Sequence, residues 1–253
     1  MREIKFSDID GIKLGHAGNI KAGTGCTTII CEKGGVCGVD IRGGAPGTRE
    51  TDLLDPSAMV DKVHSIVLSG GSAFGLDSCS GVMNYLDENN IGFSVGNINV
   101  PIVCGAVIFD LEVGDPTIRP DKSMGYEAAK NSNNYSDDIQ GNVGGGIGAS
   151  VGKILGLDSA MKGGFGSYAI DLNGLQVGAA VLVNAMGDII CPETNEIIAS
   201  ALGENNTLLS TEDIMINSHN KTLNTYNGNT TIACIVTNAS FSKAQAKKIS
   251  SMA

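Results

Sequence analysis

In the first third of the chain, short apolar runs alternate with glycine-rich turns, a pattern that predicts strands. Residues 24–33 (TGCTTIICEK) and 34–44 (GGVCGVDIRGG) are two such runs. We predict that they form a hairpin that turns at Lys33-Gly34-Gly35. A third apolar run, Ile66 to Leu68, is predicted to end at Ser69-Gly70-Gly71.

Helical spacing follows this third run. Leu76, Val82 and Leu86 recur at intervals that predict an amphipathic helix with these side chains facing inward. Residues 100–111 (VPIVCGAVIFDL) are expected to form a buried extended segment because they are almost entirely apolar. Residues 125–131 (GYEAAKN) are expected to form a short helix.

The clearest local signal lies at residues 166–190, where two apolar runs flank Asn173-Gly174. This dipeptide suits a two-residue type I′ turn, because both central positions of that turn need a positive φ. The middle of the chain is therefore predicted to carry an antiparallel hairpin.

In the last quarter of the chain, the sequence predicts two helices, a connector and a strand. Residues 193–203 (ETNEIIASALG) are expected to be helical. Residues 203–229 form a polar, asparagine-rich connector that ends abruptly at an apolar strand led by Thr230 and Thr231. A helix with a serine cap is predicted within residues 240–253.

These elements together favour a mixed α/β (α+β) fold with antiparallel strands, because regular βαβ alternation is missing. The sequence shows neither an internal repeat nor a shift in composition that would mark a domain boundary. A single domain over residues 1–253 is the expected organisation.

Composition and charge narrow the function classes. Hydrophobic residues make up 42% of the 253 residues, which is enough for a substantial core. The net charge of −10 argues against a nucleic-acid partner, since phosphates are bound by Lys and Arg. No apolar run has the length of a signal peptide core or a membrane span, so a cytoplasmic location away from membranes is expected.

The seven cysteines do not suggest a metal site. None forms a CxxC pair, and the one local cluster, Cys26, Cys31 and Cys37, lies among apolar residues. We expect these three to be buried small hydrophobic side chains rather than metal ligands.

Two glycine-rich stretches approach three known motifs and fail on spacing. In GGGIGASVGKIL (144–155), Ile147 and Ile154 occupy required positions of a phosphate loop, and Ala149 takes the place of the last glycine of a dinucleotide fingerprint. GGSAFG (70–75) has Phe74 where a nucleophile elbow needs glycine. The three histidines, His16, His64 and His219, show no context of a catalytic triad, and His64 is interpreted as structural.

Several longer motifs nevertheless occur in one order, and together they resemble the P1 family of peptidases, or peptidase family S58. This family includes the L-aminopeptidase/D-amino-acid amidase-esterases, the β-peptidyl aminopeptidases and the nylon-oligomer hydrolases. The resemblance covers nearly the whole chain and rests on the segments DIRGGAPGTRETDLLDP (40–56), LSGGSAFGLD (68–77), VPIVCGAVIFDL (100–111), RPDKSMGYEAA (119–129), GNVGGGIGASVGKILG (141–156), MKGGFGS (161–167) and NTTIACIVTNASFSKAQAKK (229–248).

The resemblance implies a four-layer α/β/β/α sandwich of the N-terminal-nucleophile type, with two packed sheets. It also implies self-cleavage between Asn229 and Thr230, which would give a large subunit (1–229) and the start of a small one (230–253). The freed α-amine of Thr230, with a pKa of about 7.7–8.0, could then act as the base for its own hydroxyl. Thr231 is the alternative nucleophile if the register slips by one residue, although its side chain should face the other side of the strand.

Other site residues are carried over from the resemblance. Lys162 in MKGG resembles a lysine that hydrogen-bonds near the nucleophile, and Gly163 and Gly164 beside it are expected near the substrate and oxyanion. Asn184 in VLVNAMG resembles the asparagine whose amide helps to form the oxyanion hole. A buried amide in that apolar run also needs hydrogen-bond partners. Tyr126 in MGYEAA resembles a tyrosine that lines the site.

The implied activity is hydrolysis of amides or esters in small peptides, amino-acid amides or ω-amino-acid oligomers, by a homo-oligomer that needs no metal or organic cofactor. The family's chain normally continues past the final helix with a segment that carries two acidic residues, whereas this sequence stops at Ala253. We therefore expect that processing and activity are impaired or absent. Two alternatives stay open: a catalytically silent binding or assembly subunit, and an acyltransferase of the ornithine acetyltransferase type.

Overall fold

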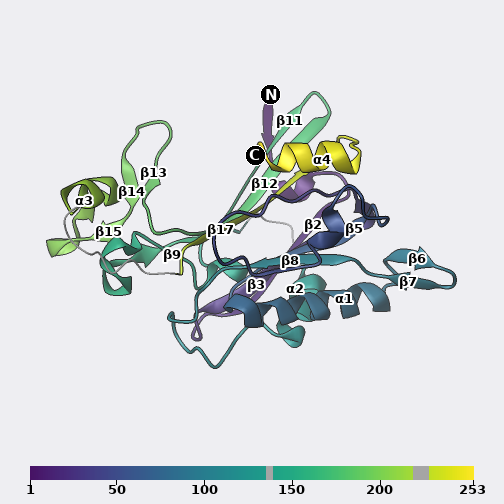
Figure 1. Ribbon diagram of the computed structural model, residues 1–253, viewed down its shortest axis with the longest axis horizontal. Coiled ribbons are helices and arrows are strands. Elements are labelled where there is room, and N and C mark those ends of the chain that lie inside the picture. Colours follow the sequence, from purple (N-terminus) through teal and green to yellow (C-terminus); the bar gives the residue numbers. More distant parts are fainter. Residues whose placement is uncertain (135–138, 219–227) are drawn as a thin grey trace.

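The computed structural model describes residues 1–134, 139–218 and 228–253, and most of its strands belong to two sheets (Figure 1). The five-stranded sheet has the order β2 (Lys13–Asn19), β3 (Thr24–Gly35), β5 (Val63–Ser69), β8 (Val103–Val107) and β4 (Thr48–Arg49). The four-stranded sheet has the order β1 (Arg2–Ile4), β11 (Gly164–Leu172), β12 (Leu175–Asn184) and β17 (Thr230–Thr237). Neighbouring strands are antiparallel except β5 and β8, so the predicted mixed α/β class is confirmed.

The two sheets pack face to face through one apolar core. Alternate residues of each strand point into it, as the two-residue period of a strand requires. Its fully buried members include Leu14, Ile29, Leu68, Phe165, Ala180 and Leu182.

A second core joins the five-stranded sheet to α1 (Ser78–Glu88) and α2 (Lys122–Asn131), which lie together along its other side in Figure 1. Val82 and Leu86 of α1 are completely buried in this core, as their spacing predicted. The helix expected at 125–131 is confirmed as part of α2, whose first turn is capped by Asp121 through a 2.8 Å hydrogen bond from the Met124 amide.

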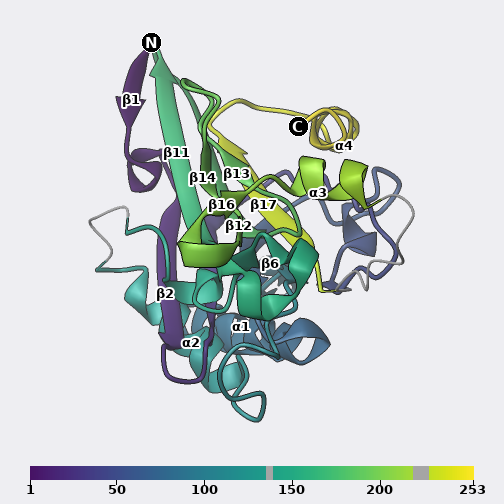
Figure 2. The same cartoon turned by 90° about the vertical axis from the view of Figure 1, so that its left-hand side faces the viewer.

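A further helix, α4 (Lys243–Ser250), follows β17 in the chain. Its N-cap is Ser242, the predicted serine cap. It lies beside β17, on the opposite side of the four-stranded sheet from β1 (Figure 2). The Lys243 ammonium holds it there by donating to the carbonyls of Leu53, Ala58 and Val60. Among the described helices none packs closely on the outer face of the four-stranded sheet, where Tyr168 and Ile235 are 55% and 50% exposed.

Among the described residues, the smaller elements include four strand pairs and one short helix. The pairs are β6 (Phe93–Val95) with β7 (Ile98–Val100), β9 (Ser150–Val151) with β10 (Met161–Lys162), β13 (Ile189–Ile190) with β14 (Ile197–Ala199), and β15 (Ala201–Leu202) with β16 (Leu208–Leu209); the helix is α3 (Thr211–Asn217).

The hairpin predicted around Asn173-Gly174 is confirmed as β11 and β12. Asn173 and Gly174 have φ of 55° and 98°, the positive values that a type I′ turn needs. The strand expected at Thr230 is also confirmed, as β17, and it extends the same sheet by pairing with β12.

Two predictions from local pattern are wrong. Residues 24–35 form one long strand that pairs with β2 and β5, so Lys33-Gly34-Gly35 is not a turn and no described strand occupies 36–47. Residues 193–203 are not helical. A turn closed by hydrogen bonds between Cys191 and the Asn195–Glu196 pair reverses the chain, and the following residues pair as β14 with β13.

The connector at 203–229 is also more structured than expected. Its first half contains β16 and α3, and α3 is capped by Ser210 and tied to Asp188 through Thr211. The predicted residue His219 lies outside the described residues. No helix in the described part of the chain has both the length and the apolar character that crossing a membrane would require.

Candidate functional site

Thr230 is the first residue of β17 and pairs with Asn184, the last residue of β12. Burial alternates along β17: Ile232 and Cys234 face the core between the sheets, while Thr231 is exposed. Thr230 shares the inward face with Ile232 because the two are separated by one residue. The prediction that Thr231 points to the other side of the strand is therefore confirmed.

Asn184 is fully buried, and its side-chain amide is saturated with hydrogen bonds. Its Oδ1 accepts from the Ser150 amide at 3.0 Å and from Lys153 Nζ at 2.9 Å. Its Nδ2 donates to the carbonyls of Phe109 at 2.9 Å and Gly228 at 3.0 Å. The partners that a buried amide needs are thus present, as the sequence led us to expect.

Lys153 is the second member of this cluster and is only 1% exposed. Its ammonium donates to the Asn184 carbonyl at 3.0 Å, to Asn184 Oδ1 at 2.9 Å and to the Gly228 carbonyl at 2.9 Å. Burial lowers the pKa of Lys153 to about 8. Three oxygen acceptors nevertheless favour its protonated form at neutral pH.

Local backbone geometry turns Lys153 inward. It begins a short 3-10 turn, Lys153–Leu155, directly after Gly152, whose φ is 67°. A Cβ at Gly152 would lie 2.0 Å from the Ser200 backbone, so only glycine allows this approach. The amides of Gly152 and Lys153 donate to Gly187 and Met186, which fixes the turn beside the end of β12.

Asp110 lies three residues past the end of β8 and is 2% exposed. Its carboxylate accepts from the Gly71 amide at 2.6 Å and from Thr24 Oγ1 at 2.8 Å. Burial raises its pKa, although these hydrogen bonds and the charge of Lys162 oppose the rise. The preceding residue, Phe109, supplies the carbonyl that binds Asn184.

Lys162, Gly163 and Gly164 lie one strand away from Asn184. Lys162 pairs with Ser150, and its ammonium donates to the Ile147 carbonyl at 2.5 Å. Desolvation lowers the pKa of Lys162, while the charge of Asp110 opposes that change. A Cβ at Gly163 would lie 2.2 Å from the Val183 carbonyl, so this glycine lets β12 come close.

Tyr126 does not join this cluster. It lies on α2, in the helix layer outside the five-stranded sheet, where its ring packs edge to face on Tyr85. Its hydroxyl donates to Glu88 Oε2 at 2.7 Å.

The remaining residues that the motifs singled out are mostly structural. His16 is buried, bonded to Thr27 Oγ1 at 2.8 Å and packed on Phe165, and burial lowers its pKa to about 4. His64 is buried in β5, where its Nδ1 accepts from the Ile102 amide. Cys26 is fully buried as expected, whereas Cys31 and Cys37 are half-buried.

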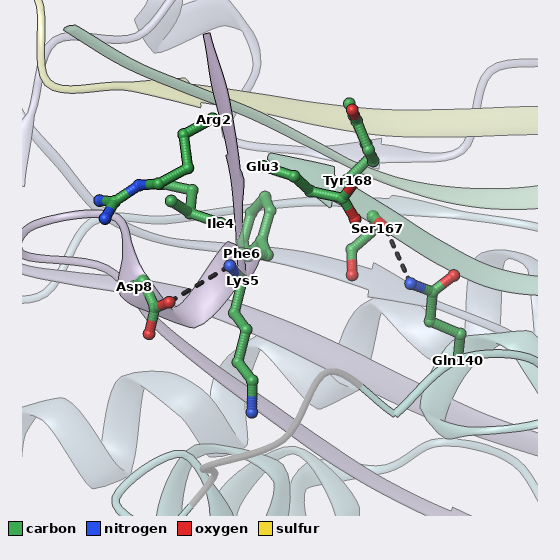
Figure 3. A pocket seen from close by; sticks show the side chains of 9 residues that line it. All are labelled: Arg2, Glu3, Ile4, Lys5, Phe6, Asp8, Gln140, Ser167 and Tyr168. Atoms are coloured by element: carbon green, nitrogen blue, oxygen red, sulfur yellow. Dashed lines mark hydrogen bonds between the residues drawn. The ribbon is translucent and has the colours of Figure 1, made fainter. Parts of the chain in front are cut away.

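A surface pocket lies far from this cluster, at the opposite edge of the four-stranded sheet (Figure 3). It is formed by β1, the turn after it and the adjacent part of β11, with Gln140 donating to the Ser167 carbonyl at 2.8 Å. Because β1 and β17 are the two edges of that sheet, this pocket is separate from Thr230.

The sequence reasoning missed Lys153 and Asp110. Lys153 lies within residues 144–155, the stretch whose spacing does not fit a phosphate loop, and that motif predicts no other role for it. A lysine inside the apolar run SVGKILGL was the available signal, because a lysine in such a run is buried only when it is well paired.

The cluster can polarise a carbonyl group. An ammonium and an amide NH₂ converge on one buried carbonyl oxygen, that of Gly228, at 2.9 and 3.0 Å. Two such donors at this distance stabilise negative charge on oxygen, as an acyl-transfer reaction requires. The oxygen that they bind lies one residue before the carbonyl of the Asn229–Thr230 bond.

Comparison with known proteins identifies the relatives of this chain. An uncharacterized aminopeptidase of Mycobacterium leprae is 42% identical over 200 residues, which cover 73% of this chain and 53% of the relative. A 6-aminohexanoate-oligomer endohydrolase of Agromyces sp. is 32% identical over 189 residues, which cover 75% of this chain and 50% of that relative. This chain spans about half the length of the curated relatives that it matches.

Solved structures share the fold. The L-aminopeptidase D-Ala-esterase/amidase of Ochrobactrum anthropi, described as a variant of the Ntn hydrolase fold, superposes with a TM-score of 0.66 at 16% identity, covering 96% of this chain and 65% of that one. A β-aminopeptidase of Burkholderia sp. gives a TM-score of 0.63 at 16% identity, and the match covers 98% of this chain and 66% of that one. The family model of peptidase family S58 matches residues 5–253, and the chain therefore belongs to peptidase family S58.

Proposed function

We propose that this chain is an autoprocessed N-terminal-threonine hydrolase. This proposal departs from the impaired processing expected from the sequence, because Lys153 and Asn184 place two donors on the carbonyl of Gly228, next to the bond to be cut. It cuts itself between Asn229 and Thr230 into residues 1–229 and 230–253. The processed protein hydrolyses amide or ester bonds in small peptides, amino-acid amides or ω-amino-acid oligomers.

In the first step the Thr230 hydroxyl attacks the Asn229 carbonyl carbon. The C–N bond breaks as the ester forms, and the hydroxyl proton ends on the leaving Thr230 nitrogen. Water then hydrolyses the ester and leaves an Asn229 carboxylate. A free α-amine ordinarily has a pKa of about 7.7–8.0, which suits that of Thr230 to serve as the base in later turnovers.

The observation that supports this proposal best is the pair of donors beside Thr230. Lys153 and Asn184 bind a backbone carbonyl one residue before the proposed bond, and Thr230 faces inward at the same end of β12. The names of the relatives, aminopeptidase and oligomer endohydrolase, support a hydrolase of this class.

The first test is the intact mass of the purified protein under denaturing conditions. Two species that sum to the full chain plus one water, split between Asn229 and Thr230, are expected. Thr230→Ala should give one full-length species, because it has no hydroxyl to attack. Thr231→Ala is the matched control and should still be cut, since its side chain is on the outer face.

Activity is then measured by release of nitroaniline from amino-acid p-nitroanilides. Thr230→Ala should lose it, whereas Thr231→Ala should retain most of it. A single uncut mass for the wild-type chain, together with no release of nitroaniline, would contradict the proposal and favour a silent subunit.

A further inference from the structure

We propose that the backbone carbonyls of Leu53, Ala58 and Val60 form a binding site for a primary ammonium group, and that Lys243 is its tethered ligand. Occupation of this site docks the first turn of α4 on the body of the protein. With the Lys243 side chain removed, the same site binds a free primary alkylammonium ion. Neither binding nor docking requires self-cleavage of the chain.

The arrangement of the three oxygens matches one ammonium group. They accept from Lys243 Nζ at 3.0, 2.8 and 3.0 Å, and a lysine ammonium has three N–H donors. Each donor therefore has its own acceptor, and the fourth tetrahedral position of the nitrogen is taken by Cε. Calcium fits poorly, because it takes about six to eight oxygens at about 2.3–2.6 Å. K⁺ is also coordinated by carbonyl oxygens, but it has no N–H groups to direct at these three.

The loop that supplies the oxygens is shaped by its own sequence. Residues Asp52–Leu54 form a short 3-10 helix, and the Leu54 side chain is buried. The Asp55 carboxylate then accepts from the amide and the hydroxyl of Ser57, which closes the next turn. These two hydrogen bonds lower the pKa of Asp55, and the charge of Lys243 acts in the same direction. A negative charge therefore stays close to the carbonyls and favours a cation there.

The docking of α4 depends on polar contacts. Within the described part of the chain, no residue of α4 is fully buried, so hydrophobic burial contributes little to holding the helix in place. Lys247 donates to the Val39 carbonyl, which attaches the second turn of α4. Lys243 attaches the first turn to a different segment, residues 53–60. Loss of the Lys243 ammonium should therefore release the first turn of the helix.

Chemical rescue of Lys243→Ala tests the site, in a Thr230→Ala chain that stays in one piece. Hydrogen exchange of the α4 amides, followed by mass spectrometry, should be at least tenfold faster than in the Thr230→Ala chain that keeps Lys243. The ion n-propylammonium replaces the missing atoms from Cγ to Nζ, and it should restore most of the protection with saturation. Tetramethylammonium at the same concentration has charge without N–H donors and should restore little. No loss of protection, no rescue, or equal rescue by the two ions would overturn the proposal.

Lys248→Ala is the matched control, because Lys248 is exposed on the same helix and its side chain has no hydrogen bond or ion pair among the described residues. Its α4 amides should exchange as they do with Lys248 present, and equally fast exchange in the two alanine variants would contradict the role of Lys243.

A variant that keeps the charge covers a Lys243→Ala protein that fails to fold. In Lys243→Arg, the planar guanidinium cannot direct three N–H groups from one nitrogen at the three oxygens. The urea midpoint of Lys243→Arg should therefore fall below that of Lys248→Arg. Equal midpoints for the two arginine variants would overturn the proposal, whether or not the wild-type chain is cut at Asn229–Thr230.

Discussion

At the scale of single residues, the cluster around Lys153 is notable because its positive charge is held by dipoles. Among its hydrogen bonds are three that go to two carbonyl oxygens and one side-chain amide oxygen. A cation held by neutral acceptors keeps its ability to polarise another oxygen, whereas a directly paired carboxylate would cancel that field. Each acceptor is therefore important for keeping the buried charge in place.

Asn184→Ala is expected to lower the free energy of unfolding by roughly 2–4 kcal/mol. It removes the acceptor of the Ser150 amide, one donor to the Phe109 carbonyl and one acceptor of Lys153. Urea denaturation in a Thr230→Ala background, which keeps the chain intact, measures this change. Asn97→Ala, at an exposed turn, is the control and should change stability by less than about 0.5 kcal/mol. Equal effects of the two substitutions would contradict this account.

His16 should make the protein sensitive to acid. Its pKa is about 4 in the folded chain and 6.5 in the unfolded chain, so between these values only the unfolded state takes up a proton. Stability is therefore present above pH 6.5 and is lost as pH falls toward 4, by up to about 1.4 kcal/mol per pH unit from this residue. Urea midpoints of wild type and His16→Gln between pH 7 and 4.5 test this. If the urea midpoints of the two proteins fall in parallel as the pH is lowered, His16 is not the cause of the loss of stability in acid.

At the scale of elements, the β11–β12 hairpin determines where the site forms. β12 pairs with β11 on one side and with β17 on the other, and its last residue is Asn184. A shift of one residue in this hairpin would turn Asn184 away from the core, because side chains alternate along a strand. The turn at Asn173-Gly174 thus helps to set the register of residues ten positions away.

Gly174→Ala is expected to cost about 1–2 kcal/mol of stability. Gly174 has a φ of 98°, and a Cβ there would meet no atom within 4 Å, so the cost is backbone strain alone. Gly187→Ala is the matched control, because its Cβ also has open space and its φ is not in the left-handed region. Thermal unfolding should show a clear loss for Gly174→Ala and little change or a small gain for Gly187→Ala. Similar losses in both would contradict the strain argument.

Elements whose signals are local could be predicted from the sequence, and those that depend on distant partners could not. The turn at Asn173-Gly174 and the cap at Ser242 each depend on the identity of two or three neighbouring residues. Residues 197–199 have a helix-compatible pattern, yet they pair with β13 because the intervening turn brings the two together. Residues 24–35 look like half of a hairpin, but their partners lie at 13–19 and 63–69.

The same distinction applies to the candidate site. Asn184 could be identified because an amide at the end of an apolar run needs partners, and Thr230 because it begins a strand after a polar connector. Lys153 is 31 positions from Asn184 in the sequence, and only the folded chain brings its ammonium to the Gly228 carbonyl. Tyr126 was carried over by resemblance, and the structure holds it in another layer.

At the scale of the whole molecule, the two faces of the four-stranded sheet differ sharply. Its inner face packs on the five-stranded sheet, while its outer face carries apolar side chains without a covering described helix. The exposed members include Tyr168, Leu172, Leu175 and Ile235. Contiguous apolar surface of this kind binds hydrophobic dyes and promotes association, even in a protein with a net charge of −10.

Ile235→Lys should therefore reduce the fluorescence of bound anilinonaphthalene sulfonate without loss of folded structure. Ile235 is 50% exposed, so a lysine there can keep its charge in water. Ile20→Lys is the control, since Ile20 is 79% exposed in the turn between β2 and β3, away from this face. Dye titrations of the three proteins measure the difference, and equal reductions would show that this face is not the binding surface.

The pairing of Thr230 with Asn184 also has a consequence in time. The two residues are 46 positions apart and meet only after β17 has joined β12. Self-cleavage between Asn229 and Thr230 would therefore occur only in molecules in which β17 has paired with β12, and it would not be reversed if the molecule later unfolded. A cut molecule that later unfolds would have lost the covalent tether between β17 and the rest of the chain, and recovery would depend on two pieces meeting by diffusion. Each molecule would thus have one opportunity to fold as a single chain.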